Sequence, residues 1–166
     1  MKGKIFILII STLLLTINTL CQSTAIGRIS AEIIEPIIIT KNTDMDFGAI
    51  ESNINGGDIE LTPQGIRNTT ESIKLSDKRT VSNASFKIMG QPKYNYSITL
   101  PNNANLNNNS NQLIVDSFTS YPSGTGTIDD NGNGTINIGA TLHMNPNQSV
   151  GIYSNDNGLI VVVNYN

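Results

Sequence analysis

Few side chains in this sequence have the type and spacing that chemistry requires. His143 is the only histidine of the chain. It lies in an alternating run in which Leu142 and Met144 take the inward positions, so His143 is predicted to point outward. A lone outward histidine is usually a surface residue, and without a cysteine partner it cannot build a zinc site of cysteine and histidine ligands. No role in catalysis is predicted for it.

An acidic, asparagine-rich turn has a pattern that is typical of metal binding. Residues 129–136 (DDNGNGTI) match the first half of a calcium loop, with oxygen side chains at positions one, three and five and Gly134 at position six. The twelfth position, which should be a bidentate glutamate, is Ala140. The pair Asp129 and Asp130 would suit hydrolysis only if it faced a cleft. A solvated turn without metal or catalysis is therefore predicted here.

A second acidic stretch contains a triplet of residues that is also found in protein kinases. Asp46-Phe47-Gly48 matches the metal-binding triplet of protein kinases, but the other kinase elements are missing. Phe47 and Met45 alternate with aspartates, as expected of core residues on a strand with solvated neighbours. The sequence also contains no Gly-x-Ser-x-Gly elbow and no Walker-type phosphate loop. We therefore predict no catalytic, cofactor-binding or metal-binding residue, and no enzymatic activity.

The elements that would position these residues are β-strands, because the dominant hydrophobic period is two. Apolar and polar residues alternate over residues 84–88, 94–100 and 136–144. Such runs are typical of strands with one face on a core. The inward positions that they predict are Ala84, Phe86, Ile88, Tyr94, Tyr96, Ile98, Leu100, Ile136, Ile138, Ala140, Leu142 and Met144.

Two further apolar runs lie near the ends of the chain. Residues 29–40 are rich in isoleucine and are split by Pro36, which cannot donate to a ladder and favours an edge or a bulge. The last nine residues, 158–166, predict a strand that runs to the terminus. Because both faces of this strand are apolar near its start, we expect it to lie inside a sheet. One face carries Leu159, Val161, Val163 and Tyr165, and the other carries Ile160 and Val162.

Asparagine and glycine separate these runs. Asn-Gly pairs at 55–56, 131–132, 133–134 and 157–158 predict turns with positive φ. The asparagine-dense stretch at residues 102–111 is interpreted as a low-complexity loop, because asparagine suits turns better than a core. Many short strands without a sustained helical period predict an all-β fold, a single antiparallel β-sandwich of immunoglobulin-like or pilin-like type.

The N-terminus predicts export. Lys2 and Lys4 precede an apolar stretch over residues 5–20, and small residues follow where a signal peptidase requires them. We therefore predict a cleaved secretory signal peptide at residues 1–25 and one mature domain at residues 26–166.

The single cysteine precedes the predicted cleavage site. Cleavage after Ala25 removes Cys21, so the mature chain is expected to have no disulfide and no stable membrane anchor. Lipidation of Cys21 is the alternative, although Leu20 is large for that processing.

The charge distribution argues against nucleic acid as a partner. The chain has a formal net charge of −3, and no lysine or arginine follows Lys93. Nucleic-acid binding needs a cationic stripe, and the second half of the chain offers none. No cofactor is predicted either.

Three blocks of sequence together resemble a known family. They are residues 45–50 (MDFGAI), residues 84–101 (ASFKIMGQPKYNYSITLP) and residues 138–166, which contain IGATL, NQ, GIYS and the ending VVVNYN. This pattern resembles family 4402 of the bacterial domains of unknown function and covers nearly the whole mature chain. That family has no assigned activity. It is similar in organisation to spore-coat-U-like and archaic chaperone–usher pilin subunits, which share an incomplete immunoglobulin-like sandwich.

The resemblance implies a mode of assembly. In such subunits the N-terminal extension of one copy completes the open sheet of the next, and a periplasmic chaperone pairs with the C-terminal strand. Other subunits or a periplasmic chaperone are therefore the partners that it implies. Two alternatives remain open for residues 29–39, which are either the donor strand or the first strand of a self-complete sandwich. The short segment before Ile29 favours the second.

These observations predict an exported, non-enzymatic structural or adhesive domain, a fimbria-like subunit in the periplasm or on the outer surface of a Gram-negative bacterium. The alternative is a standalone secreted module that binds surface glycans or a small ligand. Its stacking platform would consist of Tyr94, Tyr96, Tyr121 and Tyr153. Because Tyr94 and Tyr96 share a strand face that should be buried, core packing is the favoured role for those two.

Overall fold

A computed structural model describes residues 23–70, 73–76, 78–155 and 157–166. The chain divides into two units, Met1–Ile33 and Ile34–Asn166. Residues 23–33 form no helix or strand. Most of the predicted signal peptide, including Cys21, lies outside the described residues. Within the described residues, no helix is long and apolar enough to cross a membrane.

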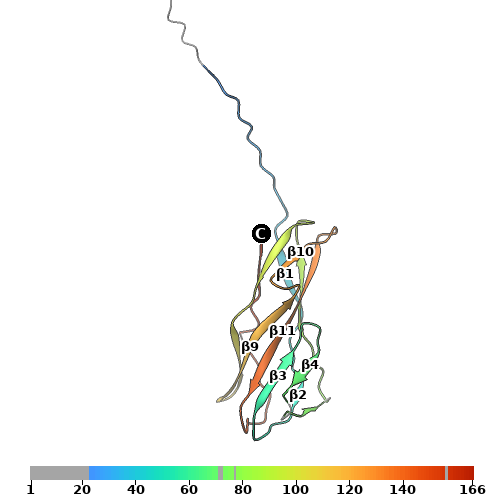
Figure 1. The fold of residues 1–166 in the computed structure, drawn as a ribbon, viewed down its shortest axis with the longest axis vertical. Helices are drawn as coiled ribbons and strands as arrows, with labels where there is room; N and C mark the ends of the chain where they lie inside the picture. Colours follow the sequence, from blue (N-terminus) through green and yellow to red (C-terminus); the bar gives the residue numbers. More distant parts are fainter. Residues whose placement is uncertain (1–22, 71–72, 77, 156) are drawn as a thin grey trace, which may run out of the picture. The chain divides into compact units, whose positions relative to one another are not determined.

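The unit Ile34–Asn166 is built from antiparallel β-strands, and its described residues contain no helix (Figure 1). This confirms the predicted all-β, antiparallel fold. The strands are β1 (Ile38–Thr43), β2 (Ala49–Ile50), β3 (Gly57–Leu61), β4 (Arg67–Thr69), β5 (Leu75–Ser76), β6 (Ala84–Met89), β7 (Asn95–Thr99), β8 (Asn103–Asn108), β9 (Asn111–Tyr121), β10 (Thr125–Thr127), β11 (Asn133–Met144) and β12 (Val162–Tyr165).

The long strand β11 organises the largest sheet. Its first half pairs with β6 and its second half with β3, while β9 pairs along its other edge. Beyond these neighbours, β1 pairs with β6, β4 with β3, and β8 with β9. A second sheet has the order β10-β7-β12, and β2 pairs with β5 in a short ladder. Strand β11 therefore has a fixed register with strands from three parts of the sequence.

One core cluster joins the two sheets into a sandwich. Ile88 of β6 and Ile136 of β11 pack against Tyr96 of β7 and Val163 of β12. Fully burying an aliphatic side chain of this size contributes about 1.5–3 kcal/mol to folding. The predicted inward residues of β6, the tyrosine at 96 and all five predicted positions of β11 are buried, so the period-two prediction is confirmed for these strands.

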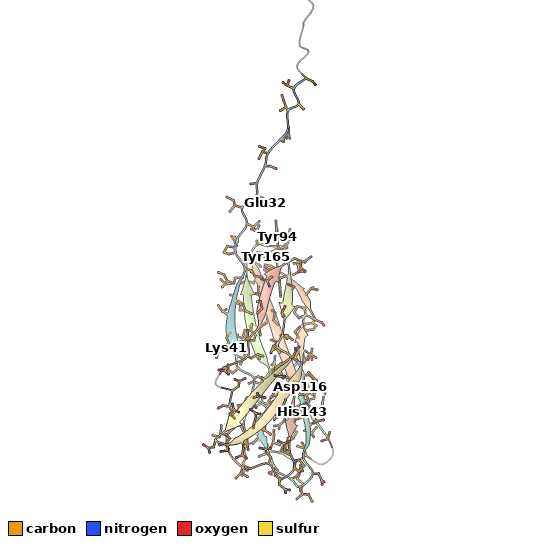
Figure 2. The ribbon with its side chains drawn as sticks, turned by 90° about the vertical axis from the view of Figure 1, so that its left-hand side faces the viewer. Glu32, Lys41, Tyr94, Asp116, His143 and Tyr165 are labelled. Atoms are coloured by element: carbon orange, nitrogen blue, oxygen red, sulfur yellow. The ribbon has the colours of Figure 1, made fainter. Side chains whose placement is uncertain are left out.

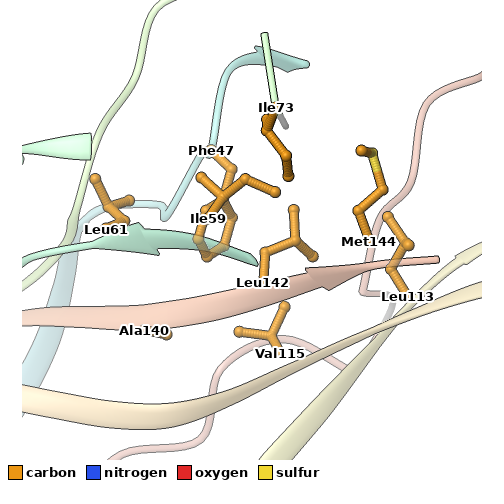
Figure 3. Close-up of a cluster of buried hydrophobic side chains, with 9 residues drawn as sticks. All are labelled: Phe47, Ile59, Leu61, Ile73, Leu113, Val115, Ala140, Leu142 and Met144. Carbon is orange, nitrogen blue, oxygen red and sulfur yellow. The ribbon is translucent and has the colours of Figure 1, made fainter. Parts of the chain in front are cut away.

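A second core cluster lies toward the other end of β11. Leu142 and Met144 pack there with Ile59 of β3 and with Leu113 and Val115 of β9 (Figure 3). Phe47, which comes from the segment between β1 and β2, is also a buried member of this cluster. Its predicted core role is confirmed, although the residues around it form only an isolated bridge between Asp46 and Ser82.

The asparagine-rich stretch is a strand rather than a loop. Residues 103–108 form β8, which pairs with β9 in full register, and Asn109 in the turn has φ of 51°. Ala104 and Leu106 alternate with asparagines and pack against the second core cluster. The loop prediction was wrong because asparagine occupies mainly the outward face, where its polarity is compatible with a strand.

The turn predictions are confirmed at three Asn-Gly pairs and wrong at one. Gly56, Gly132 and Gly158 have φ of 68°, 78° and 69°, the left-handed region that favours glycine. Gly134 instead lies within β11 and pairs with Ile88 of β6. Its lack of a side chain leaves room for the Tyr96 ring, whose hydroxyl would lie 3.2 Å from a Cβ at this position.

The C-terminal strand is shorter than predicted and lies at a sheet edge. Strand β12 begins at Val162, and in the described part of the chain it pairs only with β7. The expectation that it lies inside a sheet is therefore wrong for this chain alone. The predicted division of its faces is confirmed, since Leu159, Val161, Val163 and Tyr165 pack on the first core cluster whereas Ile160 and Val162 are exposed.

Only the second half of the N-terminal isoleucine run forms a strand. Its second half, from Ile38, is the domain's own first strand, and β1 is an edge strand paired with β6, as Pro36 just before it suggests. Its first half, up to Ile33, forms no strand. The compact unit consequently begins at Ile34, eight residues after the predicted start of the mature domain at Ile26.

The penultimate residue, Tyr165, forms hydrogen bonds that connect the beginning of the compact unit to its end. The Tyr165 hydroxyl accepts a 2.7 Å hydrogen bond from the Gln91 backbone amide and donates a 2.9 Å bond to the Glu35 carbonyl. Its ring packs edge-on against Tyr94 at 5.6 Å between centroids (Figure 2). A side chain at Gly90 would collide with this hydroxyl. The Tyr165 contacts therefore fix where the chain enters β1.

Candidate functional site: an apolar cleft and a histidine–aspartate cluster

An apolar cleft with a volume of about 870 Å³ opens onto the second core cluster. Its floor is made by β8, β9 and β11. Four of the floor residues, Leu113, Val115, Leu142 and Met144, are buried core residues, so the cleft reaches the core of the domain. We refer to this site below as the apolar cleft. The remaining floor residues are Ala104, Leu106 and Phe118.

One wall of the apolar cleft is the segment at residues 43–50, which contains the Asp-Phe-Gly triplet. Asp46 accepts a 2.8 Å hydrogen bond from the Gly48 amide and pairs with Arg79 at 2.9 Å. Gly48 has φ of 77°, and this turn directs Phe47 into the core. The aspartate therefore shapes the wall, and its oxygens are bonded to a backbone amide and to an arginine.

A second wall of the apolar cleft is the segment that leads from β11 to β12. Val150 and Ile152 lie on it with side chains that are 88% and 73% exposed. The backbone amides and carbonyls of residues 150–152 form no hydrogen bond in the described part of the chain. This wall combines exposed apolar side chains with unpaired main-chain groups, which are the two features that an added β-strand uses.

A tyrosine holds this wall in place. The Tyr153 hydroxyl donates to the Ser149 carbonyl at 2.8 Å and accepts from the Gln148 side chain at 2.7 Å. Its half-buried ring packs against the second core cluster. A bridge between Asn107 and Ser154 fixes the wall to β8. Both wall segments of the apolar cleft are thus anchored to the rest of the domain.

The four tyrosines of the predicted stacking platform have different surroundings. Tyr96 is 1% exposed and belongs to the first core cluster, so core packing, the favoured role, is confirmed for it. Tyr94 is half-buried against Tyr165, and Tyr121 is exposed at the end of β9. Only Tyr153 lines the apolar cleft.

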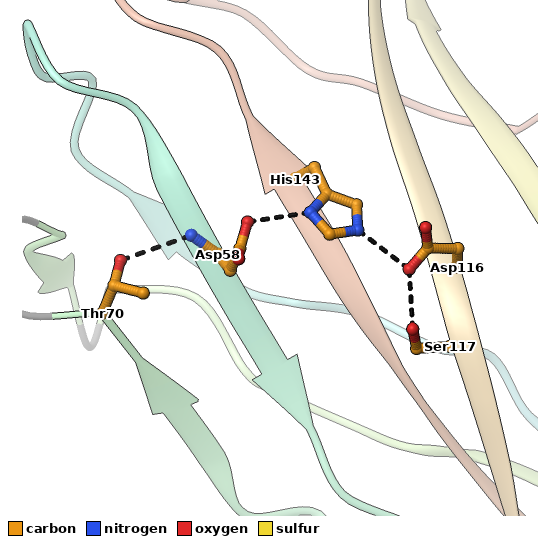
Figure 4. A network of polar contacts seen from close by, with 5 residues as sticks. All are labelled: Asp58, Thr70, Asp116, Ser117 and His143. Carbon is orange, nitrogen blue, oxygen red and sulfur yellow. Dashed lines mark hydrogen bonds and ion pairs between the residues drawn. The ribbon is translucent and has the colours of Figure 1, made fainter.

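The single histidine lies in a polar cluster on the outward face of the large sheet. As predicted, His143 points away from the core, and its side chain is 39% exposed. Its Nδ1 lies 2.8 Å from Asp58 of β3, and its Nε2 lies 2.8 Å from Asp116 of β9 (Figure 4). Carboxylates only accept hydrogen bonds, so both contacts form together only when the imidazole is protonated. When His143 is protonated, the cluster therefore links three adjacent strands.

This arrangement does not form a nucleophile and base pair. The Ser117 hydroxyl donates to Asp116 at 2.9 Å, whereas an activated serine must bond to the imidazole. Both ring nitrogens of His143 are bonded to carboxylates, which leaves neither free to accept a proton from a hydroxyl. No group of three or more side chains suited to a metal ion occurs in the described ranges. The geometry is that of a structural ion-pair cluster.

The ion pairs shift the titration of the cluster in opposite directions. Hydrogen bonds to Asp116 and then to Asp58 raise the pKa of His143 above its ordinary value of 6.5, although partial burial opposes this. Hydrogen bonds from His143 and then Ser117 lower the pKa of Asp116 below its ordinary value of 3.8. The protonated histidine and the ionised aspartate therefore coexist across the mildly acidic range.

Replacing His143 by glutamine should remove a pH-dependent share of the stability. Because the folded-state pKa of His143 is raised, this share is fully present below pH 6.5 and is lost as the pH rises through the folded-state pKa. The lowered pKa of Asp116 means that its own share is lost only as the pH falls below 3.8. We expect the urea midpoint of the wild type to exceed that of H143Q at about pH 5.5 and to approach it at about pH 8.5. A difference that stays constant over this range would contradict the ion-pair assignment.

The acidic turn is closed by its own backbone. One carboxylate oxygen of Asp129 accepts hydrogen bonds from the amides of Asn131 and Asn133, at 2.8 and 2.9 Å. Asp130 is exposed and forms an ion pair with Lys93 at 3.3 Å. The oxygen that would be the first calcium ligand thus closes an Asx turn, as favoured from the sequence.

Sequence reasoning missed the two aspartates around His143 and the apolar cleft. Asp58 is 85 residues from His143 and Asp116 is 27 residues away, so only the sheet register brings them together. Asp58 lies directly opposite His143 on β3, and Asp116 lies diagonally beside it on β9. Opposite charges at such positions stabilise the pairing of neighbouring strands. The apolar character of residues 150–152 was visible, but it does not identify what that segment faces.

Comparison with known protein families identifies a matching family model. A family model described as "Domain of unknown function (DUF4402)" matches residues 37–165, which confirms the resemblance predicted from the three sequence blocks. No curated protein and no solved structure gives a significant match.

Proposed function

Since this chain belongs to the DUF4402 family, whose description assigns no activity, we propose a function from the geometry of its apolar cleft. The chain is an exported, non-enzymatic structural or adhesive domain, a fimbria-like subunit that joins other chains by accepting a β-strand. It acts in the periplasm or on the outer surface of a Gram-negative bacterium. The observation that carries this proposal is a cleft floored by core residues and walled by an unpaired, apolar segment.

The physical need for a partner supports assembly. An exposed segment with free main-chain groups and apolar side chains is a site of uncontrolled pairing unless another strand covers it. Strand β12 adds a second unpaired edge in the described part of the chain, and both Ile160 just before it and Val162 at its start are exposed. A strand added along this side would bury these side chains and satisfy backbone groups. The partners are other subunits or a periplasmic chaperone.

Mature chains should migrate as a ladder on an unheated denaturing gel and as a monomer after boiling, because a strand shared between subunits dissociates slowly. Replacing Ile152 by aspartate should abolish the ladder, since it places a charge on the apolar wall at a site that is already exposed. Ile66→Asp is the matched control, because Ile66 is also exposed but lies outside the cleft.

Two results would contradict assembly through the cleft. The first is a wild-type chain that remains a monomer and refolds reversibly alone. The second is a ladder that I152D and I66D affect equally. Far-UV circular dichroism of both variants should match the wild type, because both side chains are exposed.

A standalone module that binds surface glycans or a small ligand is the second candidate. Tyr153 favours it, because its ring lies at the cleft and sugars commonly stack on tyrosine. This candidate expects a monomer that binds immobilised glycans and loses binding when Tyr153 is replaced by alanine. A glycan array without signal above background would exclude the glycan form of this candidate.

A further inference from the structure

We propose that Asn157 is a site of spontaneous covalent modification, at which the folded chain converts asparagine into aspartate and isoaspartate without an enzyme. The chemistry is independent of the proposed function. Asn157 belongs to one of the four Asn-Gly pairs of the sequence, and all four pairs carry the same reactive groups. Their surroundings in the structure differ, and these differences single out Asn157.

The reaction needs only the two residues of the pair and water. The backbone nitrogen of Gly158 attacks the side-chain carbonyl carbon, Cγ, of Asn157 and loses its proton. The bond between Cγ and the side-chain nitrogen breaks, and ammonia leaves with that proton. Water then opens the resulting succinimide ring. Cleavage between Cγ and the Gly158 nitrogen yields aspartate, whereas cleavage of the original peptide bond yields isoaspartate. No oxidation or reduction occurs. Because glycine has no side chain, it hinders the attack least.

The attack requires a glycine amide that is weakly bonded and a backbone that is free to rotate. The Gly158 amide forms a long bond of 3.3 Å, to the Asn155 carbonyl. Apart from its chain neighbours, no atom lies within 4 Å of the position that a Cβ of Gly158 would take. Both residues of the pair are exposed and lie outside the strands. The Asn157 backbone amide is bonded to Asn155, but its side chain forms no hydrogen bond with the described residues. The reacting groups of this pair can therefore approach each other without unfolding of the domain.

Two of the other pairs are held by packing or by a sheet. In the pair at 55–56 the glycine is buried, its amide donates a 2.7 Å bond to the Asn53 side chain, and a Cβ on it would collide with the Met144 carbonyl oxygen. The pair at 133–134 lies in β11, where Gly134 pairs with Ile88 of β6. Attack in either pair would require local unfolding first.

The pair at 131–132 is held by the acidic turn. The Gly132 amide donates to the Asp129 carbonyl at 3.1 Å. The Asp129 side chain accepts from the amides of Asn131 and Asn133, so the backbone on both sides of the glycine is also bonded. This pair is more exposed than the two above but more constrained than Asn157, and we expect it to react second.

Modification at Asn157 would change the entry to the C-terminal strand. Gly158 lines the apolar cleft, and Leu159 after it packs against the first core cluster. Both products carry a negative charge that asparagine lacks. Isoaspartate also lengthens the main chain, because the chain then runs through the former side-chain carbon. The product therefore differs from the original chain between the cleft wall and β12.

The test is incubation of the mature chain in mildly alkaline buffer, with samples taken from time zero over several weeks. Chymotrypsin cleaves after Tyr153 and so separates Asn157 from the pairs at 131 and 133. Mass spectrometry measures the conversion at each asparagine, and chromatography separates the aspartate and isoaspartate peptides of equal mass. We expect conversion at Asn157 to be several times faster than at the other three. The variant N157Q should lose the signal at this position, because glutamine would have to close a larger ring.

The same incubation in concentrated urea is the control for the role of the fold. In the unfolded chain the four pairs should react at similar rates, since the folded structure no longer distinguishes them. Native conversion at residue 55, 131 or 133 as fast as at Asn157 would overturn the inference. It would also be overturned if Asn157 reacted only in urea, or if it exceeded the other pairs by the same factor in both conditions. Because no step depends on assembly, these outcomes leave the proposed function to its own test.

Discussion

Replacing Tyr96 by alanine should lower the free energy of unfolding by about 4 kcal/mol. The side chain is 1% exposed and lies in the core cluster that joins β6 and β11 to β7 and β12. Its ring fills the space left by two glycines, since a Cβ at Gly126 would collide with it and one at Gly134 would lie 3.2 Å from its hydroxyl. Neither glycine can extend into the vacated volume, so a cavity would remain between the two sheets.

Tyr96→Phe is the control for this prediction. It keeps the ring and removes only the hydroxyl, whose burial raises the pKa of Tyr96, so its cost should stay below about 1.5 kcal/mol. Urea unfolding followed by far-UV circular dichroism measures both variants. An alanine variant within about 1 kcal/mol of the wild type would contradict the core assignment. It would also restore Tyr96 as a candidate for ligand stacking, the role that its burial now argues against.

The strands that alternation predicted best are those with one face on a continuous core. In β11 every second residue from Ile136 to Met144 is buried, because the strand lies in the middle of the sheet and its inward face contacts both clusters. Strand β8 follows the same rule with Ala104 and Leu106, but its asparagines concealed the pattern. Where the polar face of a strand consists of one residue type, the period of the apolar residues therefore predicts the strand better than the composition of the segment does.

The alternation of β9 changes phase, for a reason that no local pattern reveals. Leu113 and Val115 point inward, but the next apolar residue is Phe118, three positions later. The register with β11 shifts between Gly139 and Thr141, which leaves an extra residue on β9. Ser117 has φ of 51° at this bulge. A bulge depends on the partner strand, so it could not be placed from the sequence alone.

The candidate site was the least predictable part of the chain. The outward direction of His143 followed from its neighbours, but its two aspartates come from other strands. The apolar cleft depends on where the wall at residues 148–155 passes over β8 and β9, and that segment forms only an isolated bridge. The C-terminal run predicted a strand that lies within a sheet. The structure shows instead that one edge of β12 is open, because in the described residues β12 pairs with β7 alone.

Replacing Gly139 by alanine should destabilise the fold by about 3 kcal/mol, because backbone atoms leave no room for a side chain. A Cβ here would collide with the Leu61 carbonyl oxygen and lie 2.7 Å from the Pro63 nitrogen. Main-chain atoms at the end of β3 cannot move aside without breaking its pairing with β11, which begins at Ala140 opposite Leu61. The strain would therefore act on the strand that forms the floor of the apolar cleft.

Gly134→Ala is the matched control on the same strand. The three atoms nearest to a Cβ at this position all belong to side chains, with the Tyr96 hydroxyl at 3.2 Å, so the cost should be about 1 kcal/mol or less. Alanine also loses less backbone freedom than glycine on entering a strand, which offsets part of that cost. Urea midpoints of the two variants give the comparison. Equal urea midpoints would contradict this prediction. They would show that the backbone at the end of β3 can move, so that β11 shifts against β3 without loss of the core that the two strands share.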